Sequence, residues 1–150
     1  MQGYYQRPEL TDAALVAGWL RTGDTGRIDE CGVARLTGRI KHEINRAGIK
    51  IQPEDIDLLL ERHPAVLEAC AFGIPDPVSG EIVGVAVHCA DGAGESAESL
   101  RRWCLERLRR EAVPERWFLV AEIPKTDRGK INRQAVWAHC AGDRSAGSKA

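Results

Sequence analysis

VLEACAFGIPDPVSGEIVGVAVHC, residues 66–89, holds two nearly continuous apolar runs with a proline-rich segment between them. The first run covers residues 66–72 and the second covers residues 82–89. Apolar runs of this length are typical of strands that are buried on both faces. We expect a loop over the segment GIPDPVSGE, because its prolines are incompatible with a helix. The sequence therefore predicts two strands inside a sheet.

Helical signals flank these two strands. Pro53 is followed by two acidic residues, which is typical of a helix start, and Pro64 marks the end of that helix. Beyond the strands, Ser96 and Asn132 are expected to cap two further helices, with a third strand over residues 117–123 between them. The order helix, strand, strand, helix, strand, helix predicts an α+β fold in which helices flank a small three-stranded sheet.

The chain before Pro53 carries shorter elements. We expect a helix over residues 12–17 that Gly18 ends, followed by two hairpins. The hairpins pair residues 25–29 with 33–37 and residues 43–46 with 49–51. At the other end of the chain, the small and polar residues 142–150 are expected to form a disordered tail.

The composition limits the classes of partner. The chain has 150 residues, 43% of them hydrophobic, which allows one domain with a short additional piece. A net charge of −1 provides no overall attraction to nucleic acid or to an acidic membrane, so we expect neither partner. The arginines of residues 101–110 fit a solvated helix face, with a nucleic-acid-binding helix as the alternative. The N-terminal MQGYYQRPEL lacks the apolar core of a signal peptide, and no apolar stretch has the length of a membrane span.

Five cysteines and four histidines are spread along the chain without metal-ligand spacing. No two cysteines follow a CxxC pattern, and their odd number argues against a disulfide framework. We therefore expect no metal site, several buried thiols and a reducing, cytoplasmic location. The cysteines are Cys31, Cys70, Cys89, Cys104 and Cys140, and the histidines are His42, His63, His88 and His139.

A polar loop over residues 124–130, PKTDRGK, carries three cations and a glycine, so it can present Lys130 to an anion. It is not a Walker A loop, because Pro124 stands where that motif needs glycine and no Ser or Thr follows Lys130. As an isolated pattern, the segment fits an ordinary exposed basic loop better than a binding site.

Two further motifs carry candidate binding residues. In WLRTGD, residues 19–24, Asp24 can accept two hydrogen bonds from a vicinal diol such as a ribose, although an aspartate that closes a turn has the same pattern. In GRIKHEINRAG, residues 38–48, Arg39 and Lys41 lie at the junction of two segments. A linker with exposed basic residues is the alternative interpretation of that second motif.

Taken together, these motifs resemble the adenylate-forming superfamily of acyl-CoA synthetases, peptide-synthetase adenylation domains and luciferases. GYYQRPE looks like the GYYNRPE segment of the family, and INRAGIKIQPEDID is similar to INRGGxKIxPxEIE of its acyl-CoA synthetase branch. GWLRTGDTGRID, HPAVLEACAFGIPDP and EIPKTDRGKINR also match, so the resemblance covers residues 3–138. The chain departs from the pattern at Asp55 and Asp57, where the family has glutamates.

The resemblance implies a role for each matched residue. Asp24 matches the aspartate that holds the ribose hydroxyls of ATP and of the acyl-adenylate, and Arg39 matches an arginine near the same ribose. Lys41 occupies the hinge position at which the small domain pivots between two orientations. Gly48 matches the glycine of a loop beside the entry path of the thiol. Lys130 matches the catalytic lysine of the adenylation step.

The same resemblance implies ATP or AMP, magnesium, and CoA or phosphopantetheine as cofactors. The implied partners are a carboxylic acid, CoA or a carrier protein, and a large N-terminal adenylation domain. On this basis residues 1–38 are the end of that large domain with its ribose-binding segment, and residues 39–42 are the hinge. Residues 43–141 are then the C-terminal α+β domain, before the tail of residues 142–150.

The expected function is that of the C-terminal part of an ATP-dependent carboxylate ligase of the acyl-CoA synthetase type. Such an enzyme forms an acyl-adenylate and then an acyl thioester with CoA or a carrier protein. We expect the isolated chain to be inactive, because most of the active site belongs to the large domain. A stand-alone docking module for a carrier protein or a separate large domain is the alternative. The sequence leaves open whether the chain is a subunit of a split ligase or a piece of a longer one.

Overall fold

The computed structural model describes residues 1–90, 92 and 94–142. The chain forms two compact units, Met1–Lys41 and His42–Ala150. The division between them falls inside residues 39–42, the segment predicted as a hinge, and the pivoting role of that segment stays a prediction. Among the described residues, none of the helices combines the length and the apolar character that a membrane crossing requires.

The first unit begins with a short helix, α1 (Pro8–Ala14). The prediction of a helix over residues 12–17 was therefore wrong in its bounds. Pro8 fits the first turn of α1, where its missing N–H is not needed. Ala17 and Gly18 take positive φ values of 51° and 81°, which no helix allows. They form the turn between two short paired strands, β1 (Leu15–Val16) and β2 (Trp19–Leu20).

An antiparallel hairpin follows, formed by β3 (Asp24–Ile28) and β4 (Ala34–Arg39). This hairpin confirms the first of the two predicted ones and extends further at its open end, where Asp24 pairs with Arg39. At its closed end, the Asp29 carboxylate accepts hydrogen bonds from two backbone N–H groups of the turn, at 3.0 and 2.9 Å. The hairpin thus brings Asp24 and Arg39 side by side.

The second unit contains a five-stranded sheet in the order β6-β5-β8-β7, with β9 paired in parallel to β8. The predicted α+β class is confirmed. The sheet has five strands rather than three because the hairpin of β5 and β6 joins it where Arg46 pairs with Gly80. The elements after β4 are η1 (Ile40–His42), β5 (Ile44–Arg46), β6 (Ile49–Ile51), α2 (Pro53–Leu60), β7 (Val66–Asp76), β8 (Gly80–Cys89), α3 (Ala97–Leu105), η2 (Arg110–Ala112), β9 (Arg116–Leu119) and α4 (Arg133–Gly142).

The two long strands β7 and β8 form one antiparallel hairpin. The predicted loop over GIPDPVSGE is mostly strand, because the ladder continues to the pair of Asp76 and Gly80. Pro75 is tolerated there because β7 is the last strand in the sheet order, so no further strand needs its N–H. The turn is closed by the Asp76 carboxylate, which accepts hydrogen bonds from the N–H of Ser79 at 2.8 Å and from that of Val78 at 3.1 Å.

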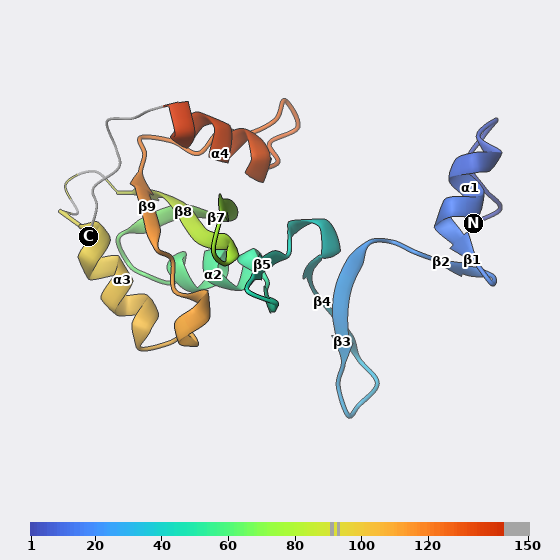
Figure 1. Cartoon of the computed structure of the whole chain (residues 1–150), viewed down its shortest axis with the longest axis horizontal. Coiled ribbons are helices and arrows are strands. Elements are labelled where there is room, and N and C mark those ends of the chain that lie inside the picture. Colours follow the sequence, from blue (N-terminus) through green and yellow to red (C-terminus); the bar gives the residue numbers. More distant parts are fainter. Residues whose placement is uncertain (91, 93, 143–150) are drawn as a thin grey trace. The chain divides into compact units, whose positions relative to one another are not determined.

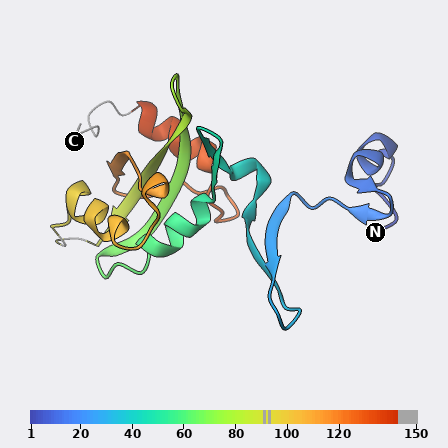
Figure 2. The ribbon, with the colours of Figure 1, turned by 60° about the horizontal axis from the view of Figure 1, so that its bottom comes forward.

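Alternating side chains of the sheet build a core on each face. One core packs the sheet against α2 and α3, and the other packs it against α4. Helices therefore cover both faces, with α4 on one side and α2 with α3 on the other (Figure 1, Figure 2). The sheet residues of the first core are Ile44, Ile51, Val66, Ala69, Ala71, Val83, Val85, Val87 and Trp117, and those of the second are Cys70, Phe72, Ala86 and Phe118.

The two predicted helix caps are confirmed. The Ser96 hydroxyl accepts a hydrogen bond from the N–H of Ser99 at 3.1 Å at the start of α3. The Asn132 side chain accepts hydrogen bonds from two N–H groups of α4, at 3.1 and 3.3 Å. The third predicted strand is shorter than expected, since β9 ends at Leu119. Of the predicted tail, Gly142 belongs to α4 and residues 143–150 lie outside the described residues.

Candidate functional site

The ion pair of Asp24 and Arg39 forms the centre of a hollow in the first unit. Arg39 Nε lies 2.8 Å from Asp24 Oδ1 in an ion pair across the open end of the β3–β4 hairpin. The hollow has a volume of about 710 Å³. It is lined by Leu20, Arg21, Thr22, Gly23, Asp24, Arg39, Ile40 and Lys41.

The chemistry of this hollow suits a ligand that carries both hydroxyl groups and negative charge. The ion pair uses one oxygen of the Asp24 carboxylate, and a carboxylate has several acceptor positions. Arg21, Arg39 and Lys41 supply three cations around it. Gly23 has a φ of 75°, and a Cβ added there would meet no atom of the described residues within 4 Å beyond its two chain neighbours. The backbone at this point is therefore open to close approach.

The turn between β5 and β6 holds a second predicted site residue, Gly48. Ala47 and Gly48 have φ values of 49° and 87°, the geometry of a tight two-residue hairpin turn. The Ala47 N–H donates to the Ser79 carbonyl at 2.6 Å, which ties this turn to the β7–β8 turn. Apart from its two chain neighbours, no described residue has an atom within 4 Å of the position that a Cβ at Gly48 would take. The turn is therefore fixed at its base and open at its tip.

Lys130 ends a small closed loop before α4. The loop closes through an antiparallel bridge of Lys125 with Ile131 and through the Thr126 N–H, which donates to the Lys130 carbonyl at 2.8 Å. The Lys130 N–H donates to the Thr126 hydroxyl at 3.2 Å, and Gly129 supplies a φ of 71°. Lys125 forms an ion pair with Glu68. Lys130 is exposed and has no ion-pair partner among the described residues, so its ammonium group is available to a ligand.

A half-buried charged cluster lies directly behind this loop, and no role was predicted for it. Arg133, whose side chain is 15% exposed, donates to Asp57 Oδ2 at 2.7 Å and to Glu54 Oε1 at 3.1 Å. It also donates to the Ala71 carbonyl at 2.9 Å. His42 Nδ1 lies 2.9 Å from the same Glu54 oxygen. The cluster joins η1, α2, β7 and the first residue of α4.

The electrostatics of the two carboxylates differ. Burial raises the pKa of Asp57 to about 6, even though the charge of Arg133 and the Ala71 N–H act to lower it. Burial also acts to raise the pKa of Glu54, but the hydrogen bond with His42 and the charge of Arg133 outweigh it, so this pKa lies below its usual value. Because Glu54 is ionised at neutral pH, His42 Nδ1 is the donor in their hydrogen bond.

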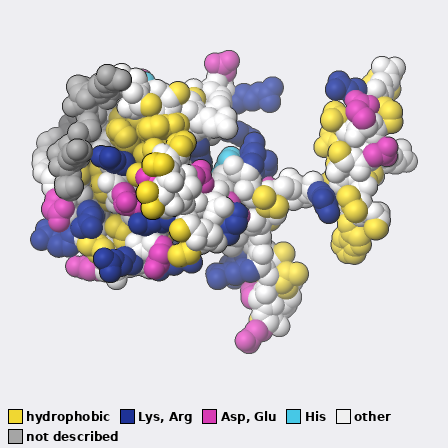
Figure 3. Space-filling view, in the orientation of Figure 1, with side chains coloured by type: hydrophobic (Ala, Val, Ile, Leu, Met, Phe, Trp, Pro, Cys, Tyr) yellow, Lys and Arg dark blue, Asp and Glu magenta, His cyan; other side chains and the backbone are white. Residues whose placement is uncertain are grey.

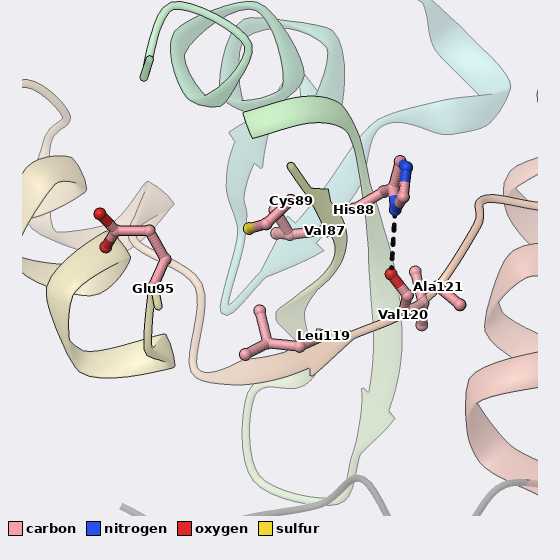
Figure 4. Close-up of a pocket in the computed structure, with 7 residues that line it drawn as sticks. All are labelled: Val87, His88, Cys89, Glu95, Leu119, Val120 and Ala121. Atoms are coloured by element: carbon pink, nitrogen blue, oxygen red, sulfur yellow. Dashed lines mark hydrogen bonds between the residues drawn. The ribbon is translucent and has the colours of Figure 1, made fainter. Parts of the chain in front are cut away.

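A second hollow, of about 280 Å³, lies where β8 meets the end of β9 (Figure 4). His88 is the residue there with catalytic potential, and its Nδ1 lies 3.3 Å from the Val120 carbonyl (Figure 4). The Glu95 carboxylate accepts a hydrogen bond from the Ser99 hydroxyl at the start of α3. With its polar groups bonded locally and its other lining residues apolar or thiol, this hollow is no match for a charged ligand.

The structure brings together three of the five predicted site residues, because Asp24, Arg39 and Lys41 line one hollow. Gly48 lies in the β5–β6 turn and Lys130 lies at the closing end of its loop, both in the second unit, and the roles of all five stay predictions. The Arg133 cluster was missed because its members come from distant parts of the sequence. One signal was available: Arg133 follows Lys130 within the matching motif EIPKTDRGKINR.

The visible surface of the second unit does not gather its basic residues into one patch. Lys and Arg side chains alternate there with Asp and Glu side chains (Figure 3). Within the segment of residues 101–110, Arg107 pairs with Glu106 and stacks on Trp103 at 3.6 Å from the ring centre. These contacts favour the interpretation of a solvated helix face over a nucleic-acid site.

Comparison with known proteins gives consistent results. A family model described as the AMP-binding enzyme C-terminal domain matches residues 55–130. A probable CoA ligase, CCL9, from Humulus lupulus is 41% identical over 138 residues, which are 92% of this chain and 26% of that protein. An oxalate–CoA ligase from Arabidopsis thaliana is also 41% identical over 138 residues, with 92% and 27% covered. The chain thus spans about a quarter of the length of the curated relatives that it matches.

Solved structures agree in fold. The amide bond synthetase McbA from Marinactinospora thermotolerans matches with a TM-score of 0.86 and 40% identity, over 93% of this chain and 29% of that one. The o-succinylbenzoate CoA synthetase from Bacillus subtilis, in complex with the acyl-adenylate intermediate OSB-AMP, matches with a TM-score of 0.86 and 28% identity, over 99% and 29%.

Proposed function

The chain belongs to the AMP-binding enzyme C-terminal domain family, and from this membership we propose that it is the C-terminal part of an ATP-dependent carboxylate ligase. The complete enzyme forms an acyl-adenylate and then an acyl thioester with CoA or a carrier protein. The observation that carries the proposal is Lys130, an exposed cation without an ion-pair partner among the described residues, on a loop closed at its base.

In the first step, a carboxylate oxygen of the acid attacks the α-phosphorus of ATP. A bond from that oxygen to phosphorus forms, and the bond from phosphorus to pyrophosphate breaks. Two anions meet in this reaction, so a cation placed where negative charge develops lowers the barrier. Lys130 fills this role, because lysine carries a compact charge on a flexible stem.

The hollow around Asp24 holds the nucleoside. The Asp24 carboxylate accepts hydrogen bonds from the ribose hydroxyls, and Arg39 orients that carboxylate through the 2.8 Å ion pair. Arg39 and Lys41 also balance the negative charge of the adenylate, since both line the same hollow.

In the second step, a thiol sulfur attacks the carbonyl carbon of the acyl-adenylate, and AMP leaves. Lys130 is no longer needed once pyrophosphate has left. A pivot at Lys41 removes it and brings up the turn at Gly48, which has no side chain to block the thiol. One small domain thereby serves both reactions.

Magnesium is the cofactor that the family resemblance implies for the phosphate chemistry. Among residues 1–90, 92 and 94–142, no group of three or more His, Cys, Asp and Glu side chains is arranged to hold a metal ion. The described residues thus form no metal site of their own, whereas magnesium usually needs only one or two carboxylates beside the phosphates of ATP.

The experiment uses the complete ligase, with this chain joined to its large domain, and measures the two steps separately. Lys130→Ala should abolish pyrophosphate exchange with ATP, whereas thioester formation from supplied acyl-adenylate should continue. Lys125→Ala is the matched control, because Lys125 lies in the same loop but pairs with Glu68. Unchanged exchange in Lys130→Ala would contradict the assignment and favour a docking module.

The same assay tests the expected inactivity of the isolated chain. Alone, it should give no pyrophosphate exchange with any carboxylic acid, because the acid pocket and the phosphate loop belong to the large domain. Exchange by the isolated chain would refute this part of the proposal.

We place the reaction in the cytoplasm, on the ground that Cys31, Cys70, Cys89 and Cys104 are free thiols.

A further inference from the structure

One carboxylate oxygen connects the residue after the proposed pivot with the base of the Lys130 loop. Glu54 Oε1 lies 2.9 Å from His42 Nδ1 and 3.1 Å from a terminal nitrogen of Arg133. The other oxygen, Oε2, is buried and has no hydrogen-bond partner among the described residues. The contacts of this carboxylate with His42 and with Arg133 therefore share one oxygen atom.

On one side of the link, Arg133 fixes the base of the loop. It is the first residue of α4 and follows Lys130 by only two intervening residues. Its guanidinium group is held by Asp57 at 2.7 Å and by the Ala71 carbonyl at 2.9 Å, so it is anchored to α2 and to β7 at once. An arginine with only 15% of its side chain exposed and with partners on two elements is a rigid anchor.

On the other side of the link, His42 begins the second compact unit directly after Lys41. The His42 side chain is 30% exposed and that of Glu54 is 26% exposed, so water screens their hydrogen bond only in part. His42 Nδ1 donates this hydrogen bond to the ionised carboxylate of Glu54. Such charge-assisted hydrogen bonds are about twice as strong as neutral ones.

We propose that Glu54 is a positioning residue that links His42, beside the pivot, to the Lys130 loop through Arg133. When the second unit rotates at Lys41, Lys130 then moves with it as part of one rigid body. Without the link, the loop would change conformation instead. This role of the link rests on the proposed function, which supplies the pivot and the reacting lysine. The contacts themselves lie wholly within the second unit.

The test measures backbone amide hydrogen exchange in the whole chain by nuclear magnetic resonance. The loop is reported by the amides of Thr126, Gly129 and Lys130, all of which are hydrogen-bonded within it. Global unfolding is reported by Val85, a fully buried residue of β8. Glu54→Gln should raise exchange of the loop amides about tenfold relative to Val85, the change expected when one charge-assisted hydrogen bond is lost.

His42 variants show whether the effect is transmitted through Glu54. His42→Ala should raise exchange of the same loop amides, and His42→Lys, which keeps a donor in reach of Glu54, should restore slow exchange. In a Glu54→Gln background, His42→Ala should add nothing. Asp55→Asn is the matched control, because it removes an exposed carboxylate from the same helix turn.

Three outcomes would overturn the proposal. In the first, His42→Ala leaves exchange of the loop amides unchanged; in the second, His42→Ala still raises their exchange in the Glu54→Gln background. In the third, exchange of the loop amides and of Val85 rises equally. If Glu54→Gln does not fold, the pair of His42 variants alone carries the test. Exchange needs no ligase activity. A Lys130→Ala enzyme that still adenylates would therefore refute the proposed function without touching this link.

Discussion

Replacing Asp57 with asparagine should change how the stability of the chain depends on pH. Burial raises the pKa of this carboxyl from 3.8 to about 6 in the folded protein. Between these two values the folded state binds the proton more tightly than the unfolded state does. The free energy of unfolding that Asp57 contributes is therefore greatest below about pH 4 and falls as the pH rises to about 6.

The magnitude follows from the difference between the two pKa values. About two pKa units, at about 1.4 kcal/mol for each, correspond to about 3 kcal/mol between pH 4 and pH 7. Asparagine has the same shape as aspartate but does not titrate. The free energy of unfolding of Asp57→Asn therefore lacks this decrease between pH 4 and pH 7. Glu54 titrates in both proteins, and its contribution largely cancels in the comparison. The variant should therefore gain about 3 kcal/mol relative to the wild type over this pH range.

Urea unfolding, followed by tryptophan fluorescence at intervals from pH 4 to pH 8, measures the difference directly. Asp55→Asn provides the control, because it replaces an exposed carboxylate on the same helix with the same amide. A difference between wild type and Asp57→Asn that is flat with pH would refute the reasoning. So would the opposite slope, since it would mean that Arg133 holds the pKa of Asp57 below its usual value.

Two further substitutions test the turn and the core. Gly48→Ala should lower the free energy of unfolding by about 1–2 kcal/mol, because alanine is strained at a φ of 87°. An unchanged free energy in urea unfolding would show that the turn tolerates a side chain. Ile56 is fully buried between α2 and the sheet. In the same assay, Ile56→Ala should lower the free energy of unfolding by about 2–5 kcal/mol and Ile56→Val by about 1 kcal/mol. Equal losses for the two variants would argue against the packing described.

The parts of the fold that were predicted from the sequence depend on local signals. The apolar runs of β7 and β8, the caps at Ser96 and Asn132, and the start of α2 at Pro53 are each encoded within a few residues. The predicted bounds of α1 were wrong, because the turn at Ala17 and Gly18 outweighs the helical preference of the alanine-rich segment before it.

The parts that were missed depend on contacts between distant residues. Nothing near Pro75 in the sequence reveals that β7 is the last strand in the sheet order, which is what allows a proline there. The pairing of Arg46 with Gly80, which adds two strands to the sheet, is equally remote in the sequence.

The candidate site divides in the same way. Asp24 and Arg39 were identified from motifs, and the hairpin places them 2.8 Å apart. The functions predicted for them, and for Lys41, Gly48 and Lys130, came from the family resemblance and stay predictions. Arg133 was overlooked because the sequence alone does not distinguish an arginine near a helix start that contacts α2 and β7 from one on the surface.

The position of β7 in the sheet also bears on the exposure of a strand edge to other molecules. A long outermost strand offers its free backbone groups to the strands of other molecules, which is a common route to aggregation. Here each half of the strand carries an obstacle to such pairing. The ion pair of Glu68 with Lys125 puts charge beside the first half, and Pro75 removes a donor from the second. Lys125, which closes the Lys130 loop at one end, thus also contributes one charge of the ion pair on this outermost strand.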